Sequence, residues 1–293
     1  MASEKGQSLW GDAWTRLRKN RLAMTCLGLV LFFSALALYG EIVYRYHNVM
    51  DTTPSYQMTH LDQAYTPPSL QHWMGTDGLG RDVMARLIQG VRIAFMVGFM
   101  TSLIAIPIGV FLGCLAGYYG GRTDSFIVWL YNTFASMPGL LFILAIAMVV
   151  GKGLIGIYLG IGLTTWVGIC RLVRGEVIKH KDQSYVQAAR ALGLSSGRIV
   201  FRHILPNIMH IIIITFTLRF PAAVGTEVVM SFLGIGVQGE PSWGLMINSA
   251  RMRLWQGMWW EMTFVTLAVF LLVLAFNLLG DALRDALDPR LND

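Results

Sequence analysis

Two ionisable side chains lie inside an otherwise apolar segment, and they are the residues best placed for chemistry at membrane depth. Arg219 and Glu227 fall within residues 208–230, which are mostly aliphatic or aromatic. An arginine at the centre of a membrane-spanning helix costs about 2.5–3.5 kcal/mol, so it is expected to face a cavity or a partner. We predict that both residues line a passage or pair with another subunit, although Glu227 could equally lie at the outer interface. Pro138, in a second apolar segment, is a third candidate because proline kinks a helix.

The motifs of familiar enzyme sites are absent from the sequence. There is no G-x-x-x-x-G-K-[ST] loop, no H-E-x-x-H, no G-x-S-x-G and no C-x-x-C. The histidines are scattered, without the spacing of a metal site. We therefore expect this chain to bind no nucleotide, metal or other cofactor. An intramembrane enzyme would need paired acids or a Ser/His/Asp set at membrane depth, and neither is present.

The elements that must position these residues are long apolar segments. The chain has 293 residues, of which 55% are hydrophobic and only 14% charged. A helix needs about 20 apolar residues to cross the hydrocarbon core of a bilayer. Five charge-free segments approach or exceed that length, and residues 208–230 make a sixth candidate. They are residues 22–40, 93–121, 125–151, 153–170 and 262–280. The prediction is an all-α, polytopic membrane protein with six transmembrane helices.

Charge sets the predicted topology. Six spans place both termini on one side, and the side that includes the termini carries 15 of the Lys and Arg residues against 8 on the other. The positive-inside rule then puts both termini in the cytoplasm. The net charge of +6 is explained largely by this bias and requires no nucleic acid. We expect a cytoplasmic interfacial helix in residues 1–21, a first span in 22–44, an extracytoplasmic loop in 45–92 and a core in 93–293. A cleaved signal peptide is the less favoured interpretation of the first span.

Small and aromatic residues in the spans predict packing and anchoring. One stripe has small residues at intervals of four, which let another helix approach closely. It consists of Ala105, Gly109, Gly113 and Gly117. The three cysteines lie in apolar segments and are expected to be packing residues. Trp259 and Trp260 are expected to anchor the last span at the membrane interface.

The most basic stretch, residues 171–206, is a cytoplasmic loop between the fourth and fifth spans. Ser184 and Gln187 fit a capping box at the start of a helix, and Gly193 is a typical C-terminal stop. A second short helix is expected to begin at residue 195 or 196 and to run to residue 204. Ala188 and Ala189 would give the first helix a smooth surface, suited to a groove of another protein.

Four strings make the sequence resemble a known family. Gln187-Ala-Ala-x-x-x-Gly193, followed by Leu205-Pro206, resembles the EAA loop of ATP-binding-cassette (ABC) importer permeases. It departs from that pattern at Gln187, where glutamate is usual, and at His203, where isoleucine is common. The other strings resemble signatures of the C-type subunit in the dipeptide, oligopeptide and nickel permeases. They are Gly75-Thr76-Asp77-Gly-Leu-Gly80-Arg81-Asp82-Val83, Ser231-Phe-Leu-Gly-Ile-Gly-Val-Gln238 with Pro241-Ser-Trp-Gly244, and residues 274–289.

The resemblance implies a type I ABC importer permease in a bacterial inner membrane, with no catalytic residues of its own. Its expected partners are a second homologous permease, two cytoplasmic ABC ATPases that use ATP and Mg, an extracytoplasmic solute-binding protein and membrane lipid. The cargo would be peptides, with nickel or another small solute as the alternative. A stand-alone secondary carrier, working without an ATPase, is the competing class.

The resemblance also assigns residues. The loop would couple to an ATPase through a helix from Tyr185 to Gly193, and the expected coupling residues are Tyr185, Gln187, Ala188, Ala189, Arg190, Gly193 and Pro206. The string from Gly75 to Val83 lies in the predicted extracytoplasmic loop and is called the outer motif below. Its Asp77, Arg81 and Asp82 either contact the binding protein or form a local salt-bridged turn, with Asp82 and Arg86 four residues apart. Gly75, Thr76 and Gly80 complete that motif.

Overall fold

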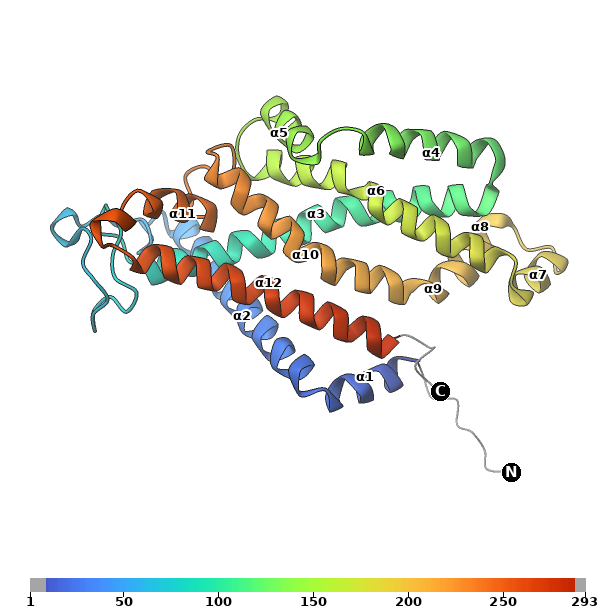
Figure 1. Cartoon of the computed structure of the whole chain (residues 1–293), viewed down its shortest axis with the longest axis horizontal. Helices are drawn as coiled ribbons and strands as arrows, with labels where there is room; N and C mark the ends of the chain where they lie inside the picture. Colours follow the sequence, from blue (N-terminus) through green and yellow to red (C-terminus); the bar gives the residue numbers. More distant parts are fainter. Residues whose placement is uncertain (1–8, 288–293) are drawn as a thin grey trace.

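The computed structural model describes residues 9–287, which form helices joined by loops (Figure 1). Within these residues, five helices are long and apolar enough to cross a membrane: α2 (Arg21–Met50), α3 (Val83–Tyr119), α6 (Leu154–Lys181), α10 (Met209–Phe232) and α12 (Trp260–Leu287). The other α-helices are α1 (Leu9–Lys19), α4 (Gly121–Ala135), α5 (Gly139–Val150), α7 (Ser184–Ala191), α8 (Ser196–Ile199), α9 (Leu205–Asn207) and α11 (Trp243–Arg251). The described residues contain no β-strand, only an isolated bridge between Thr76 and Asp82. The all-α fold class is confirmed.

The segment predicted to be the third span is broken in the middle. Helices α4 and α5 meet at 88°, and together they make a sixth span only if the bent pair counts as one. Pro138 lies at the break, immediately before α5, with a non-helical ψ of 115°. Proline has no N–H to continue the hydrogen-bond ladder, and it pushes the residue before it away from helical dihedrals. The bend is therefore much larger than the kink that the sequence suggests.

The centre of the bundle is a close contact between α3 and α6. A Cβ added to Gly109 would lie 2.6 Å from the Cβ of Ile169, and one added to Gly113 would lie 2.8 Å from the carbonyl oxygen of Cys170. These separations are shorter than real Cβ contacts, so only glycine allows the two backbones to approach this closely. The predicted packing role of the small-residue stripe is confirmed, and Cys170 is a free, buried cysteine in the same layer.

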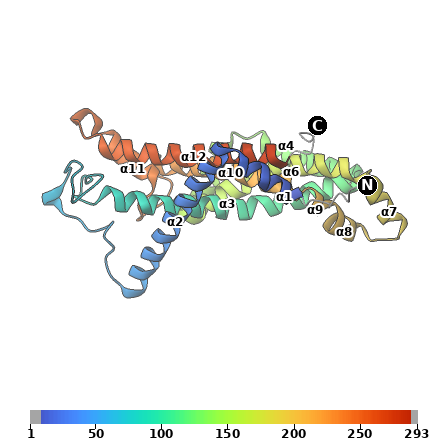
Figure 2. The same cartoon turned by 90° about the horizontal axis from the view of Figure 1, so that it is seen from below.

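Helices α2 and α3 extend into the segment that the sequence predicts to be an outer loop. The loop between them is residues 51–82 rather than 45–92. Charged residues end the apolar runs without ending the helices, because they find partners: Arg45 pairs with Glu41 at 2.6 Å, and Arg92 pairs with Glu41 at 2.7 Å. Figure 2 shows the last turns of α2 standing apart from the bundle, with the loop returning from them to α3.

The N-terminal helix α1 packs on the last helix of the bundle. Ala13 and Leu17 are buried against Ala286 and Leu287 at the end of α12 (Figure 1), whereas the aromatic side chain of Trp14 is half exposed. An apolar face against protein and a mixed face outward fit the predicted interfacial helix. Residues 1–8 of that prediction lie outside the described residues.

Candidate functional site

The basic loop folds into the two short helices that the sequence predicts, but the first of them starts one residue earlier than predicted. Helix α7 begins at Ser184 itself, and the residue that caps it is Gln183, without a side-chain bond. The carbonyl of Gln183 accepts from the backbone N–H groups of Val186 and Gln187 at 3.0 and 3.1 Å. The predicted capping box is therefore wrong, because the helix starts one residue too early for the Ser184 side chain to cap it.

Gly193 ends α7 as predicted. Its φ is +76°, in the left-handed region that favours glycine, and its N–H donates to the carbonyl of Arg190 at 2.9 Å. The second short helix also forms, from Ser196, but its last part, Val200–Ile204, is π-helical. Pro206 follows as an exposed residue in the first turn of α9.

Helix α7 has a buried face and an exposed face. Val186 and Ala189 are 0% and 4% exposed and pack into a cluster with residues of α3, α4, α6 and the π-helical turn. Gln187, Ala188 and Arg190 lie on the exposed side. Both alanines were predicted to form a docking surface, but only Ala188 is exposed to a partner. Ala189 packs the helix against the bundle.

Two side-chain contacts tie α7 to the ends of α3 and α6. Tyr185 shares a hydrogen bond of 2.8 Å with Nδ1 of His180, at the end of α6. The guanidinium of Arg190 lies 5.3 Å from the ring centre of Tyr118, near the end of α3. Burial raises the pKa of Tyr185, which is consistent with its place between the helices. A displacement of α7 would therefore be passed to both long helices.

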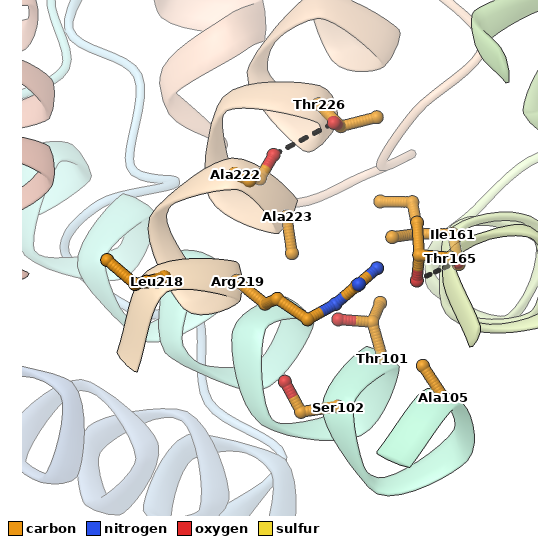
Figure 3. Close-up of a pocket in the computed structure, with 10 residues that line it drawn as sticks. All are labelled: Thr101, Ser102, Ala105, Ile161, Thr165, Leu218, Arg219, Ala222, Ala223 and Thr226. Atoms are coloured by element: carbon orange, nitrogen blue, oxygen red, sulfur yellow. Dashed lines mark hydrogen bonds between the residues drawn. The ribbon is translucent and has the colours of Figure 1, made fainter. Parts of the chain in front are cut away.

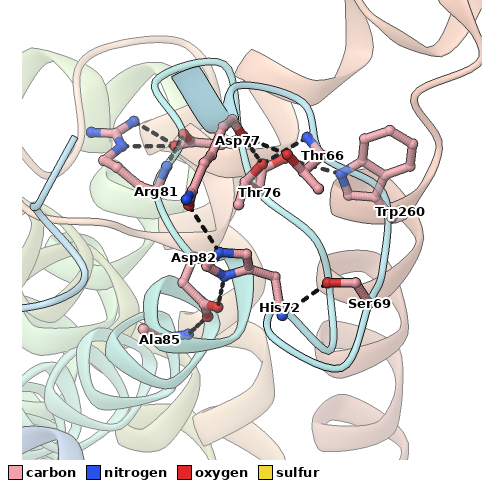
Figure 4. A network of polar contacts seen from close by, with 10 residues as sticks. Thr66, Ser69, His72, Thr76, Asp77, Arg81, Asp82, Ala85 and Trp260 are labelled. Atoms are coloured by element: carbon pink, nitrogen blue, oxygen red, sulfur yellow. Dashed lines mark hydrogen bonds and ion pairs between the residues drawn. The ribbon is translucent and has the colours of Figure 1, made fainter. Parts of the chain in front are cut away.

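At the opposite end of the bundle, the outer motif forms a tight polar network (Figure 4). The Asp77 carboxylate accepts from the backbone N–H groups of Leu79 and Arg81 at 2.9 and 3.0 Å, and from the Arg81 side chain at 2.8 Å. It also lies 3.4 Å from Nε of Arg86. The Asp77 side chain is only 4% exposed, so its bonding capacity is used within the loop.

Asp82 does not pair with Arg86, the partner that its spacing suggests. One of its oxygens accepts from the N–H of Ala85 at 2.9 Å and so caps α3, while the other contacts Nδ1 of His72 at 2.8 Å. A local turn is thus what the motif forms, with Asp77 as its centre. Asp82 caps α3 because the first N–H groups of a helix have no acceptor within the helix itself.

The remaining residues of the motif bind the loop to the bundle. The carbonyl of Thr76 accepts from Nε1 of Trp260 at 3.0 Å. Gly75 and Gly80 have φ of +74° and +71°, and a Cβ on either would collide with a backbone oxygen. Trp260 is 7% exposed, so the expectation that it anchors the last span at the membrane interface is wrong, because its indole N–H is used inside the protein.

Between these two ends, at mid-bundle, Arg219 lines a cavity of about 220 Å³ (Figure 3). The cavity lies between α3, α6 and α10, and its other lining residues are Thr101, Ser102, Ala105, Ile161, Thr165, Leu218, Ala222, Ala223 and Thr226. The guanidinium lies near Gly168 of α6, where an added Cβ would be 3.3 Å from Nη1. The placement agrees with the expectation that an arginine at this depth faces a cavity.

The other two candidate pathway residues do not line this cavity. Glu227 is 1% exposed and accepts a hydrogen bond of 2.6 Å from the hydroxyl of Ser231. That same hydroxyl accepts from the N–H of Val237, so Glu227 helps to hold the loop after α10. Pro138 is exposed at the bend between α4 and α5. Only Arg219, of the three, lines this cavity.

An ionic cluster that the sequence did not reveal joins three separate segments near the outer end. Arg92 is 3% exposed and pairs with Glu41 of α2 and with Glu240 of the loop before α11. Its guanidinium also lies 3.6 Å from the ring centre of Tyr44. Arg92 and Glu240 are 148 residues apart, so no local spacing could have identified the pair. The one available signal was the charge on Arg92, beside an apolar run.

Comparison with known proteins identifies the class of the chain. Residues 109–293 match the family model of the binding-protein-dependent transport system inner membrane component. Residues 8–68 match the model of the N-terminal TM domain of oligopeptide transport permease C. The fold is similar to inward-facing structures of the MetNI methionine ABC transporter, with a TM-score of 0.55 and 20% identity over 70% of this chain and 97% of that one.

Curated relatives match along almost the whole chain. The dipeptide transport system permease protein DppC of Bacillus subtilis (strain 168) is 41% identical, covering 96% of this chain and 85% of the relative. The oligopeptide transport system permease protein OppC of the same organism is 38% identical, covering 99% and 92%. The glutathione transport system permease protein GsiD of Pectobacterium atrosepticum is 36% identical, covering 96% and 91%. The chain therefore belongs to the inner-membrane components of binding-protein-dependent transport systems, as a permease in the peptide family of ABC importers.

Proposed function

We propose that this chain forms half of the translocation pathway for peptides in an ATP-driven importer, and that cytoplasmic ATPases move it through α7. As a member of its family it is a multi-pass transport subunit rather than an enzyme, and it works with ATPase and binding-protein partners. Relatives named for dipeptide, oligopeptide and glutathione transport support a peptide cargo.

The proposed assembly contains a second similar permease, two ATPases, an extracytoplasmic solute-binding protein and the lipid of a bacterial inner membrane. ATP and Mg would be used by the ATPases, while this chain binds no cofactor and no nucleic acid. The excess of Lys and Arg on the side of the termini supports a cytoplasmic location for both ends. That orientation also places α7, which follows the basic end of α6, on the cytoplasmic side.

The two-faced character of α7 is the observation that carries the coupling role. Its buried face is fixed to the bundle through Val186 and Ala189, so the helix can transmit force. Its exposed face offers Ala188 between longer side chains, a shape that admits a groove of a partner. When paired ATPases close, a helix held in this way would shift the ends of α3 and α6. Those helices form the centre of the bundle, so the shift would reach the mid-bundle cavity.

The structure offers little to a metal cargo. Among the described residues, no group of three or more His, Cys, Asp and Glu side chains could hold a metal ion. The cavity at mid-bundle is lined by the guanidinium of Arg219, which repels cations. These features favour a peptide over nickel.

Replacing Ala188 by tryptophan tests the coupling role. The change adds bulk to the exposed face without entering the core, so we expect normal membrane insertion and assembly. In proteoliposomes containing the complete transporter, ATP-driven uptake of tripeptide should fall at least tenfold, together with the ATPase stimulation by loaded binding protein. Thr123→Trp, at an exposed site near the start of α4, is the matched control. Unchanged uptake by Ala188→Trp, or uphill uptake without ATPases, would show that the chain works as an independent carrier.

A further inference from the structure

Arg219 has no partner among the described residues, unlike the other arginines of the spanning helices that are not exposed. Arg92 and Arg174 each pair with carboxylates, and Arg171 donates to the side chain of Asn132. Within residues 9–287, Arg219 has neither an ion pair nor a hydrogen bond, and its cavity is lined by no acidic side chain. Because an unpaired charge in a membrane protein is costly, a guanidinium held in this way is expected to receive an anion during function.

The other polar groups of the cavity are four hydroxyls that already donate to their own helices. Thr101 donates to the carbonyl of Val97, Ser102 to Gly98, Thr165 to Ile161 and Thr226 to Ala222, at 2.7–2.8 Å. Each hydroxyl oxygen retains lone pairs that can accept a further bond. The cavity therefore presents one fixed cation together with several acceptors (Figure 3). A complementary ligand has an anionic group close to N–H donors.

The C-terminal end of a peptide has this chemistry. Its carboxylate can take two parallel hydrogen bonds from a guanidinium, and its last amide N–H lies a few atoms away, within reach of a hydroxyl oxygen. The cavity, at about 220 Å³, is smaller than the roughly 300–1,000 Å³ of sites that enclose a whole small ligand. It therefore fits one end of a peptide, with the remainder of the peptide outside the cavity.

We propose that Arg219 receives the C-terminal carboxylate of a peptide in transit, held in the cavity between α3, α6 and α10. This inference rests on the proposed peptide cargo. The contact is weak and transient, since it supplies a charge pair to one end of the cargo only. An amidated C-terminus is neutral and gains no charge pair with the guanidinium, so the cavity favours a peptide with a free acid group over its amide.

Uptake of a peptide and of its amide tests the proposal. Proteoliposomes with the complete transporter are supplied with trialanine or with trialanine amide. Arg219→Gln should lower uptake of trialanine at least tenfold and change uptake of the amide less than twofold, while Arg219→Lys keeps at least a third of the trialanine rate. Because the same binding protein serves every variant, a change in the ratio of the two rates belongs to the permease. Arg18→Gln, at an exposed site in α1, is the control and should change neither rate.

A binding measurement without the binding protein covers the case in which the wild type does not transport the amide. Trialanine at millimolar concentration should raise the thermal midpoint of the purified permease–ATPase complex, and Arg219→Gln should abolish that shift. Trialanine amide should shift neither protein. A wild-type complex that shows no shift, or an equal shift in both variants, overturns the proposal.

The outcomes separate this inference from the proposed function. If Arg219→Gln lowers uptake of acid and amide alike, Arg219 pairs with a partner or supports the fold, and the carboxylate site is wrong although peptide import stands. If the intact wild-type transporter moves no peptide of either kind, the peptide cargo itself is wrong.

Discussion

The two ends of the bundle are built by different means. At the outer end, the buried Asp77 carboxylate accepts hydrogen bonds from two backbone N–H groups and the side chain of Arg81. The Trp260 indole of α12 donates a hydrogen bond to the same loop. At the inner end, α7 is held mainly by the apolar side chains of Val186 and Ala189. The outer loop is therefore held by directional polar contacts, and α7 by apolar packing together with the hydrogen bond between Tyr185 and His180.

Physical chemistry explains why the two designs suit the two tasks. Hydrogen bonds are directional, so a buried polar network defines one geometry and resists displacement. Apolar contacts are non-directional, so a helix that is held by them stays attached to the bundle through small changes of orientation. A coupling element needs the second property.

Breaking the outer network should have the largest effect on stability. Asp77→Ala leaves the guanidinium groups of Arg81 and Arg86 without their counterion and two backbone N–H groups unpaired. Removing one partner of a buried ion pair typically costs about 3–5 kcal/mol, so we expect little folded protein in the membrane and a strongly lowered thermal midpoint. Asp62→Ala, at an exposed site of the same loop, is the control. A near-normal midpoint for Asp77→Ala would remove the contrast between the two ends.

Overpacking the centre of the bundle should have an intermediate effect. Gly113→Leu places a side chain against the backbone of Cys170, which cannot move aside. Inserting bulk into a packed core costs about 1–3 kcal/mol, measured as a lower thermal midpoint of the purified complex. Gly28→Leu in α2, where an added Cβ meets nothing within 4 Å, should leave the midpoint unchanged. Equal midpoints for both variants would mean that α3 and α6 are not in close contact.

Loosening the attachment of α7 should have the smallest effect on stability. Tyr185→Phe removes the hydrogen bond to His180 and keeps the ring, so the expected cost is about 0.5–1.5 kcal/mol. The number of peptides imported per ATP hydrolysed should fall, since α7 is then tied less firmly to α6. Tyr119→Phe, an exposed tyrosine at the end of α3, is the control. A loss of stability as large as that of Asp77→Ala would show that the inner end is also a polar network.

Several local features were predictable because their causes lie within a few residues. The stripe from Ala105 to Gly117 predicted a close helix contact, since small residues at intervals of four share one face. Gly193 predicted the end of α7, because the left-handed turn after a helix favours glycine. Even local reasoning failed at Ser184, where a shift of one residue in the helix start removed the cap.

Other features depended on residues that are distant in the sequence. Asp82 was expected to pair with Arg86, yet it caps α3 and contacts His72, while Asp77 takes the arginine. Trp260 was predicted to be an interfacial anchor, but its indole N–H donates to the carbonyl of Thr76 in the outer loop. In each case several partners are possible locally, and the fold of the outer loop decides which one is within reach.

The sequence by itself determined that the chain is a polytopic membrane permease with a basic loop that forms short helices. Long apolar runs partition into a bilayer whatever their neighbours do, and motif strings keep their identity in any conformation. Only the tertiary structure decided that Arg219 faces a cavity, that Glu227 and Pro138 do not line it, and that Ala188 rather than Ala189 is exposed. Those outcomes depend on how helices rotate and pack against one another, and the free energy of that packing comes from contacts between distant segments.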